Sequence, residues 1–261
     1  MATPSASRFN TLALEYGGAV ARLTLQNPPL NVITTNMMAE LIAALEEVGG
    51  YAGISTLVLR GSGQSFSAGV DVAAHTPDKV RDMLVSFHSA VRSLMSSQKV
   101  TIAAVHGNCL GGGAELAAVC DLVLTTASAK WGFPEISLGC FPPVAAALLS
   151  AVIGQKRAAD LILTGRTISG EEATAMGLAS ESVPDAELDR RIEDTCARLS
   201  ALSPAALALT KKALYAWDSI HFDKGLARAE KIYLDELMQT HDANEGIAAF
   251  IEKRKPDWKG R

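Results

Sequence analysis

Two glutamates, each close to a glycine-containing turn, are the residues of this chain best suited to chemistry. Glu115 follows three consecutive glycines, Gly111–Gly113, and Glu135 follows Pro134. Glycine lets backbone N–H groups approach a ligand closely, and such N–H groups commonly form an oxyanion hole. Carboxylates are common partners in proton transfer. The combination predicts an enzyme that polarises a carbonyl group and moves protons beside it.

Each of these features also has a structural interpretation. Three glycines between a strand and a helix can form a tight connection, or an oxyanion site at the positive end of the helix. Glu115 and Glu135 can complement the dipoles of the helices that they begin. The upstream turn Phe66–Asp71 can be an ordinary polar turn, or it can leave the Val70 N–H free. The functional interpretation therefore depends on the combination.

The chain lacks the sequence patterns of several other kinds of catalytic and binding site. No GxxxxGK[ST] phosphate loop follows the glycines, and no Ser or Cys lies in a GxSxG context, so no covalent intermediate is expected. No histidine pair has metal-ligand spacing, and we predict neither a metal nor a separate cofactor. Of the five histidines only His75 is placed near a site; His106 is expected to be partly buried, and three others are expected at the surface: His88, His221 and His241.

Alternating strand and helix patterns predict an α/β fold up to about residue 140. Gly17-Gly18 separates two strands of a hairpin. After about residue 140 a short strand is expected at 180–183, and helices are expected at 143–152, 156–163, 170–176, 185–201, 204–217 and 221–239. The remaining expected elements are a helix capped by Thr35 or Asn36, a strand at 56–59, a helix from Pro77, a strand at 101–105, a helix at 113–120 and a strand at 122–124. We expect a catalytic core over 1–195 and a helical C-terminal region over 196–261.

Composition indicates an ordinary globular protein. Of 261 residues, 48% are hydrophobic and 20% charged, and the net charge is −4, which disfavours nucleic acid as a partner. The first ten residues lack the apolar segment of a signal peptide, and no apolar stretch is long enough to span a membrane, so a cytoplasmic location is expected. Four scattered cysteines without a CxxC pair indicate reduced, buried thiols.

Several motifs together resemble the enoyl-CoA hydratase/isomerase (crotonase) superfamily, over nearly the whole chain. The matching segments are NPPLNV (27–32), FSAGVDV (66–72), HGNCLGGGAELAAVCDLV (106–123), WGFPEISLG (131–139), LTGRTISGEEATAMGLASESV (163–183) and FIEKRKPDW (250–258). The resemblance implies a ClpP-like spiral of ββα units with a C-terminal helical region that builds trimers. It also implies an acyl-CoA thioester as substrate, with coenzyme A as part of the substrate.

The resemblance also implies roles for single residues. The oxyanion-hole N–H groups would be those of Val70 and Gly112, and the two catalytic carboxylates would be Glu115 and Glu135. Their separation of 20 residues fits the hydratases of the family. The residues expected to contact the substrate are Ala68, Gly69, Asp71, Val72, Leu110, Gly111, Phe133 and Pro142.

Two segments depart from the common hydratases. Phe133 stands where glutamine is frequent, and Phe141-Pro142-Pro143 replaces a glycine-rich turn. The segments FSAGVDV (66–72), HTPDKV (75–80) and GCFPPVAAALL (139–149) most resemble the group that hydrates cyclohexa-1,5-diene-1-carbonyl-CoA in aromatic degradation, whereas other relatives act in fatty acid metabolism. Three alternatives stay open: an enoyl-CoA delta-isomerase, a non-catalytic crotonase-fold RNA-binding protein and a purely structural trimer component.

Apolar residues in the C-terminal region predict an assembly. From about residue 200 onward they exceed what one helical layer would need for its own core, and a large apolar surface indicates a partner. The residues expected on this surface are Leu202, Leu207, Leu209, Leu214, Trp217, Leu226, Ile232, Leu234, Leu237 and Met238. Closed symmetric homo-oligomers are the common outcome. The resemblance implies a homotrimer or a homohexamer built as a dimer of trimers.

Overall fold

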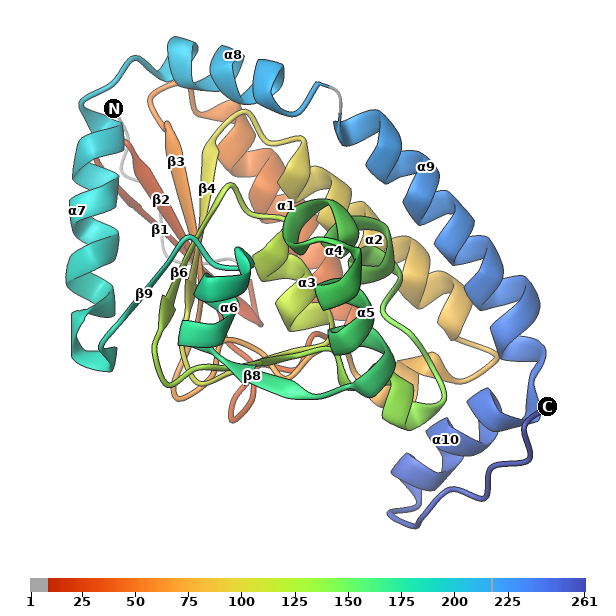
Figure 1. Cartoon of the computed structure of the whole chain (residues 1–261). Helices are drawn as coiled ribbons and strands as arrows, with labels where there is room; N and C mark the ends of the chain where they lie inside the picture. Colours follow the sequence, from red (N-terminus) through yellow and green to blue (C-terminus); the bar gives the residue numbers. More distant parts are fainter. Residues whose placement is uncertain (1–8, 217) are drawn as a thin grey trace.

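The computed structural model describes residues 9–216 and 218–261, and its centre is a six-stranded sheet ordered β1-β2-β3-β4-β6-β9 (Figure 1). β1 and β2 are antiparallel, and each later neighbour pairs in parallel. These strands are β1 Leu12–Gly17, β2 Val20–Leu25, β3 Thr56–Gly61, β4 Val100–Val105, β6 Leu122–Thr126 and β9 Glu181–Val183. A smaller sheet contains β5 Asn108–Leu110, β7 Lys130–Gly132 and β8 Thr167–Ser169.

Helices cover both faces of the large sheet (Figure 1). They are α1 Thr35–Gly50, α2 Val80–Met95, α3 Gly112–Ala118, α4 Pro143–Ile153, α5 Gln155–Thr164, α6 Gly170–Met176, α7 Leu188–Ser200, α8 Pro204–Leu214, α9 Asp218–Lys231 and α10 His241–Ile251. The 3-10 turns are Val72–His75, Pro134–Leu138, Asp185–Glu187 and Leu237–Gln239, and Ile232–Glu236 forms a π-helical turn.

Period-2 alternation in the buried strands explains the two layers of helices. In β3, Leu57 and Leu59 point into the main core with the helices α1 and α2, whereas Val58 points into a second core on the opposite face. Leu188 and Ile192 of α7 fill that second core. Successive side chains of a strand point to opposite faces, so a strand buried on both faces is apolar throughout.

Parallel pairing brings the two glycine turns to the same edge of the sheet. The turn Phe66–Asp71 follows β3, and the segment 106–113 follows β4, its parallel neighbour. A parallel bridge between Ser67 and Cys109 then holds these two connections together. Ligands of α/β sheets commonly bind beyond the carboxyl ends of the strands. The sheet thus places both turns where a binding site is expected.

Most elements that the sequence predicts are confirmed, with shifted boundaries. The hairpin turns at Gly18, and Thr34, rather than Thr35 or Asn36, caps α1, with its hydroxyl accepting from Met37 N–H. The α2 helix begins at Val80 rather than Pro77. The short strands β5, β7 and β8 are absent from the prediction, because segments of three residues carry little periodicity of their own. The helix α10, of 11 residues, is also absent from the prediction.

The surface position predicted for His88 is wrong. His88 is fully buried on α2, and its Nδ1 lies 2.5 Å from Oε1 of Glu230 on α9. Burial lowers the pKa of His88, and the Glu230 carboxylate partly opposes this effect. A histidine on an amphipathic helix is indistinguishable from a surface residue until a distant partner reaches it. Here that partner lies 142 residues later in the chain.

The C-terminal helices pack on the rest of their own chain. Phe222, Leu226 and Tyr233 belong to the main core, and Lys211 of α8 forms a 2.7 Å ion pair with Asp121. The predicted place of Leu226 and Met238 on an assembly surface is therefore wrong, because both are buried within the chain. Trp217, counted with them, lies outside the described residues. Three leucines of this region remain exposed: Leu202, Leu209 and Leu214.

The expected division between a core over 1–195 and a region over 196–261 stays a prediction. Its boundary falls inside α7, which runs from Leu188 to Ser200. Within the described residues, none of the helices combines the length and apolar character needed to cross a membrane.

Candidate active site

Two backbone N–H groups lie together where the glycine turns meet. A methyl group built on Gly69 would lie 3.5 Å from the Gly112 nitrogen, and one built on Gly112 would lie 2.7 Å from Val70 Cγ2. Gly69 has a φ of +100°, which favours glycine. Among the hydrogen bonds of residues 9–216 and 218–261, neither the Val70 nor the Gly112 N–H donates one. Both donors are therefore available to a ligand.

Buried hydrogen bonds hold the first turn in place. Ser67 Oγ donates to Asn31 O at 2.8 Å and accepts from Gly69 N–H at 3.1 Å. The Asn31 side chain, itself fully buried, donates to Ser62 O and Ser65 O, each at 2.8 Å. We assigned no role to Ser67 or to Asn31 from the sequence. Short polar residues beside glycine and proline are the sequence signal for such turn-building bonds.

Glu115 lies in the first turn of α3 and is 3% exposed. Its Oε1 accepts a 2.8 Å hydrogen bond from Ala145 N–H, at the N-terminal end of α4. Burial raises the pKa of Glu115 to about 7, and the N–H groups of Ala145 and Val144 partly oppose the increase. Because an isolated buried carboxylate is costly, burial favours the neutral acid. Glu115 can thus exchange a proton near neutral pH.

Glu135 lies in the 3-10 turn Pro134–Leu138, directly beside the glycines. A methyl group built on Gly111 would lie 2.6 Å from Glu135 Oε1, so glycine there leaves room for the carboxyl group. Oε2 of Glu135 is buried and has no hydrogen-bond partner within the described part of the chain. Burial, followed by the nearby charge of Glu115, raises the pKa of Glu135 to about 8. Two carboxyls that resist ionising together can divide into one acid and one base.

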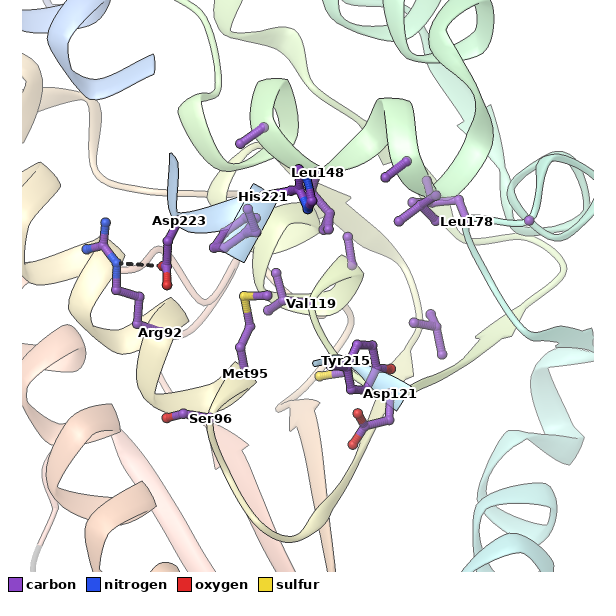
Figure 2. A pocket seen from close by; sticks show the side chains of 18 of the residues that line it. Arg92, Met95, Ser96, Val119, Asp121, Leu148, Leu178, Tyr215, His221 and Asp223 are labelled. Atoms are coloured by element: carbon purple, nitrogen blue, oxygen red, sulfur yellow. Dashed lines mark ion pairs between the residues drawn. The ribbon is translucent and has the colours of Figure 1, made fainter. Parts of the chain in front are cut away.

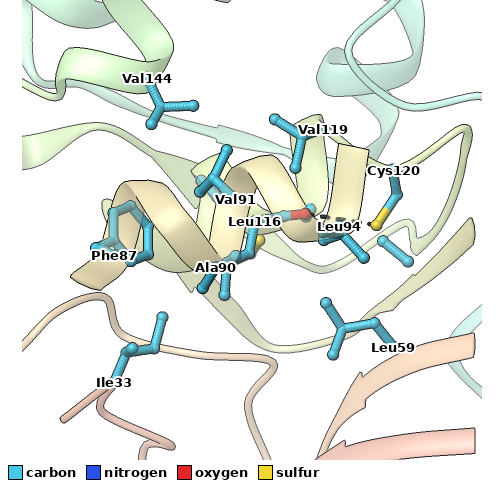
Figure 3. Close-up of a cluster of buried hydrophobic side chains, with 14 of the residues drawn as sticks. Ile33, Leu59, Phe87, Ala90, Val91, Leu94, Leu116, Val119, Cys120 and Val144 are labelled. Carbon is cyan, nitrogen blue, oxygen red and sulfur yellow. Dashed lines mark hydrogen bonds between the residues drawn. The ribbon is translucent and has the colours of Figure 1, made fainter. Parts of the chain in front are cut away.

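The ring of Phe87, from α2, packs against Gly112. A methyl group on Gly112 would also meet its ring at 3.1 Å. Figure 3 shows Phe87 within a buried cluster that includes Val91, Leu116 and Val144. This apolar support holds α3, and hence Glu115, against α2 and α4. It also supplies the low-dielectric surroundings that raise the two glutamate pKa values.

The residues predicted to contact the substrate surround these groups. Gly69 and Gly111 line the junction of the turns; Ala68, Val72 and Leu110 are half-buried close to it, and Phe133 and Pro142 are buried. Asp71 Oδ1 accepts from Ala73 N–H at 3.0 Å, which caps the 3-10 turn Val72–His75. Nδ1 of His75 lies 3.0 Å from Asp71 O, and burial lowers the pKa of His75. Contact of these residues with a substrate stays a prediction.

The described residues contain no cluster of potential metal ligands. Over the described ranges 9–216 and 218–261, no three His, Cys, Asp or Glu side chains are arranged to hold a metal ion. The predicted absence of a metal and of a separate cofactor stays a prediction. The four cysteines are buried and unpaired: Cys109, Cys120, Cys140 and Cys196.

A separate cavity of about 500 Å³ lies away from the glutamates. Figure 2 shows it between α2, α4 and the start of α9, with Met95, Val119 and Leu148 on its walls. Its charged residues are Arg92, Asp121 and Asp223. Glu115, Glu135, Val70 and Gly112 are not among its lining residues, so this cavity is not the candidate active site.

An α/β fold with free N–H donors beside the buried Glu115 and the half-buried Glu135 is typical of enzymes that act next to a carbonyl group. The sequence profile of the enoyl-CoA hydratase/isomerase family matches residues 15–261. The chain belongs to this family.

Individual relatives agree with the family assignment. The chain is 38% identical to a cyclohexa-1,5-dienecarbonyl-CoA hydratase of Thauera aromatica, over 95% of this chain and 96% of the relative. It is 35% identical to a probable enoyl-CoA hydratase of Bacillus subtilis, over 97% of this chain and 100% of the relative. A crystal structure of an enoyl-CoA hydratase from Mycobacterium avium subsp. paratuberculosis superposes with a TM-score of 0.87 at 26% identity. The match covers 96% of this chain and 99% of the chain in that structure. The predicted crotonase fold with a helical C-terminal region is confirmed.

Proposed function

We propose that this protein adds water to the conjugated double bond of an enoyl-CoA thioester, which makes it a lyase of the hydratase type. The observation that carries the proposal is the carboxyl pair of the buried Glu115 and of Glu135, whose Oε2 is buried, next to the unengaged N–H groups of Val70 and Gly112. The names of the curated relatives support the same activity. The family assignment makes the chain an enzyme and makes a binding protein or structural component a poor explanation.

The order of the two pKa values assigns the base and acid roles to Glu115 and Glu135. Near neutral pH Glu115, with the lower pKa, is the more ionised carboxyl and can accept a proton, whereas Glu135, with the higher pKa, keeps its proton and can donate it. In the proposed reaction Glu115 takes one proton from water as the water oxygen bonds to the β-carbon. The π electrons move toward the thioester oxygen, where the Val70 and Gly112 N–H groups stabilise the charge. Glu135 then donates its proton to the α-carbon.

A delta-isomerase would use the same oxyanion hole with one glutamate to move a proton between carbons. The presence of a second buried carboxyl, whose charge raises the pKa of the first, favours hydration. An isomerase needs no group to activate water. If only one of the two glutamates proves necessary, isomerisation becomes the better assignment.

For the acyl group we propose a cyclic dienoyl thioester of the cyclohexa-1,5-diene-1-carbonyl type. The Thauera aromatica relative carries this activity in its name, and other relatives are named for different acyl groups, among them a 2,3-dehydroadipyl-CoA hydratase of Escherichia coli at 32% identity. We assign the acyl group an apolar wall made of Phe133, Phe141 and Pro142, which are buried or half-buried in the segments on either side of Glu135. Such a wall suits a flat, uncharged ring better than a carboxylated chain.

The test is an assay of the purified protein against straight, branched, carboxylated and cyclic enoyl-CoA thioesters. Loss of the conjugated thioester absorbance, with the hydroxyacyl product identified by mass, measures hydration. We expect the cyclic dienoyl thioester to have the highest kcat/KM. Rapid turnover of a straight-chain thioester alone would correct the acyl group, and the absence of hydration across the whole panel would refute the proposed function.

We expect kcat/KM for hydration to depend on pH as a bell with its maximum between the pKa values of about 7 and about 8. Below this range protonation of Glu115 removes the base, and above it ionisation of Glu135 removes the acid. The two values belong to the coupled pair. The residual activity of Glu135→Gln should keep the acidic limb and lose the alkaline limb. A profile that is flat from about pH 6 to 9 would contradict the acid–base pair.

We expect the protein to form a homotrimer or a homohexamer. Leu202, Leu209 and Leu214, in and just before α8, are 54%, 67% and 67% exposed, and a second copy is a common way to cover such residues. Light scattering should give the mass of three or six chains of 27.4 kDa. A monomer mass at micromolar concentration would contradict the assembly. A cytoplasmic location and the absence of nucleic acid partners remain predictions.

A further inference from the structure

Tyr233 comes from the C-terminal region but packs against the segment that follows Glu135. It is 1% exposed, in the π-helical turn Ile232–Glu236, and π turns frequently occur at functional sites. Its ring packs edge-on against Phe141, with centroids 5.2 Å apart. Burial raises the pKa of Tyr233, and the Cys140 thiol and then the charges of Glu135 and Glu115 raise it further. Because Phe141 and Cys140 follow the turn that contains Glu135, the Tyr233 side chain packs beside that turn.

The surroundings of the Tyr233 hydroxyl leave its oxygen able to accept a hydrogen bond. Within residues 9–216 and 218–261, the buried hydroxyl has no hydrogen-bond partner, and the Cys140 thiol is its polar neighbour. Cys140 Sγ donates to Leu138 O at 3.6 Å, so its sulfur is free to accept from the Tyr233 O–H. A buried hydroxyl whose oxygen accepts nothing is costly, and its presence needs an explanation.

The segment that contains Cys140 also contains Glu135. Cys140 N–H donates to Glu135 O at 3.1 Å, so the thiol next to Tyr233 is fixed relative to the glutamate. Oε2 of Glu135 is a second buried polar atom without a partner in the described chain. Two unsatisfied polar atoms close to the same carboxyl pair are suited to a shared small polar molecule.

We propose that the Tyr233 hydroxyl is a third catalytic group, whose oxygen accepts the second O–H of the attacking water. This inference rests on the proposed hydration. One water O–H points to the Glu115 carboxylate, which takes that proton as the water oxygen bonds to the β-carbon. The other O–H stays with the oxygen, becomes the hydroxyl of the product and is held by Tyr233. Tyr233 thereby orients the lone pair of the water without gaining or losing a proton.

The experiment compares the wild-type protein with Tyr233→Phe, which keeps the ring and removes only the oxygen. Hydration kcat should fall about 10-fold, the effect of losing one hydrogen bond in the transition state, while KM stays within about 2-fold. Deuterium exchange at the α-carbon of the matching saturated acyl-CoA, read by mass, needs the oxyanion hole and Glu135 but no attacking water. That exchange should keep its wild-type rate in Tyr233→Phe.

Matched controls separate this role from packing. Tyr16→Phe removes a hydroxyl that donates to Glu47 at 2.9 Å, far from the site, and should leave hydration unchanged. Tyr233→Leu also loses the ring and should lower the melting temperature, whereas Tyr233→Phe should not. Wild-type hydration in Tyr233→Phe would overturn the inference, and so would an equal loss of hydration and exchange. An active wild-type enzyme in either case would leave the proposed function standing, whereas an inactive wild-type enzyme would refute both.

Discussion

Replacing Glu135 by Gln should lower kcat for hydration by about 10²–10⁴-fold, the range expected when a positioned proton donor is lost. The amide keeps the size of the carboxyl group, fits above Gly111, and cannot give a proton to the α-carbon. KM should change little, because the N–H groups of Val70 and Gly112 and the residues around the thioester stay in place. Steady-state kinetics on the best thioester of the panel measures both parameters.

Glu115→Gln is the matched comparison for Glu135→Gln. It should lower kcat by a similar factor, because it removes the base that takes a proton from water. A double variant should then be only slightly worse than either single variant, since residues that act as a unit are not additive. Near wild-type hydration in Glu135→Gln would refute its assignment as the acid. Full activity in Glu115→Gln alone would favour the isomerase.

Removing the Gly112 N–H should lower kcat by about 10²–10³-fold, as expected for one oxyanion-hole donor. Gly112→Pro removes this donor at the first residue of α3, where proline is compatible with a helix. Any side chain at this position would meet Val70 Cγ2, because a methyl group would lie only 2.7 Å from it. The substitution is therefore best made together with Val70→Ala.

Val70→Ala with Gly112→Ala provides the control, since it has nearly the same bulk and retains the N–H. Val70→Ala alone should be mild, because the backbone of residue 70 supplies the donor. The difference in kcat between the proline and alanine double variants measures the Gly112 N–H itself. Equal kcat values for these two variants, with both folded by circular dichroism, would exclude Gly112 from the oxyanion hole.

Local sequence patterns determined much of the fold and the choice of candidate residues. The alternation in β3 and the helical spacing in α1 reflect burial of one face or two, which depends mainly on neighbours in sequence. Glycines with positive φ at positions 69 and 111 mark turns that other residues adopt with strain. Together with the motif order these signals identified the family and the residues Val70, Gly112, Glu115 and Glu135.

Only the tertiary structure decided how these residues meet. Parallel pairing of β3 with β4 brings the two glycine turns together, and packing of α3 against α2 and α4 removes Glu115 from water. The resulting pKa values of about 7 and about 8 depend on burial and on the distance between the two carboxyls, which residue spacing does not define. For the same reason the buried partners of His88 and the approach of Tyr233 were invisible in the sequence. Both depend on contacts between segments more than 90 residues apart, as the pair His88 and Glu230, separated by 142 residues, illustrates.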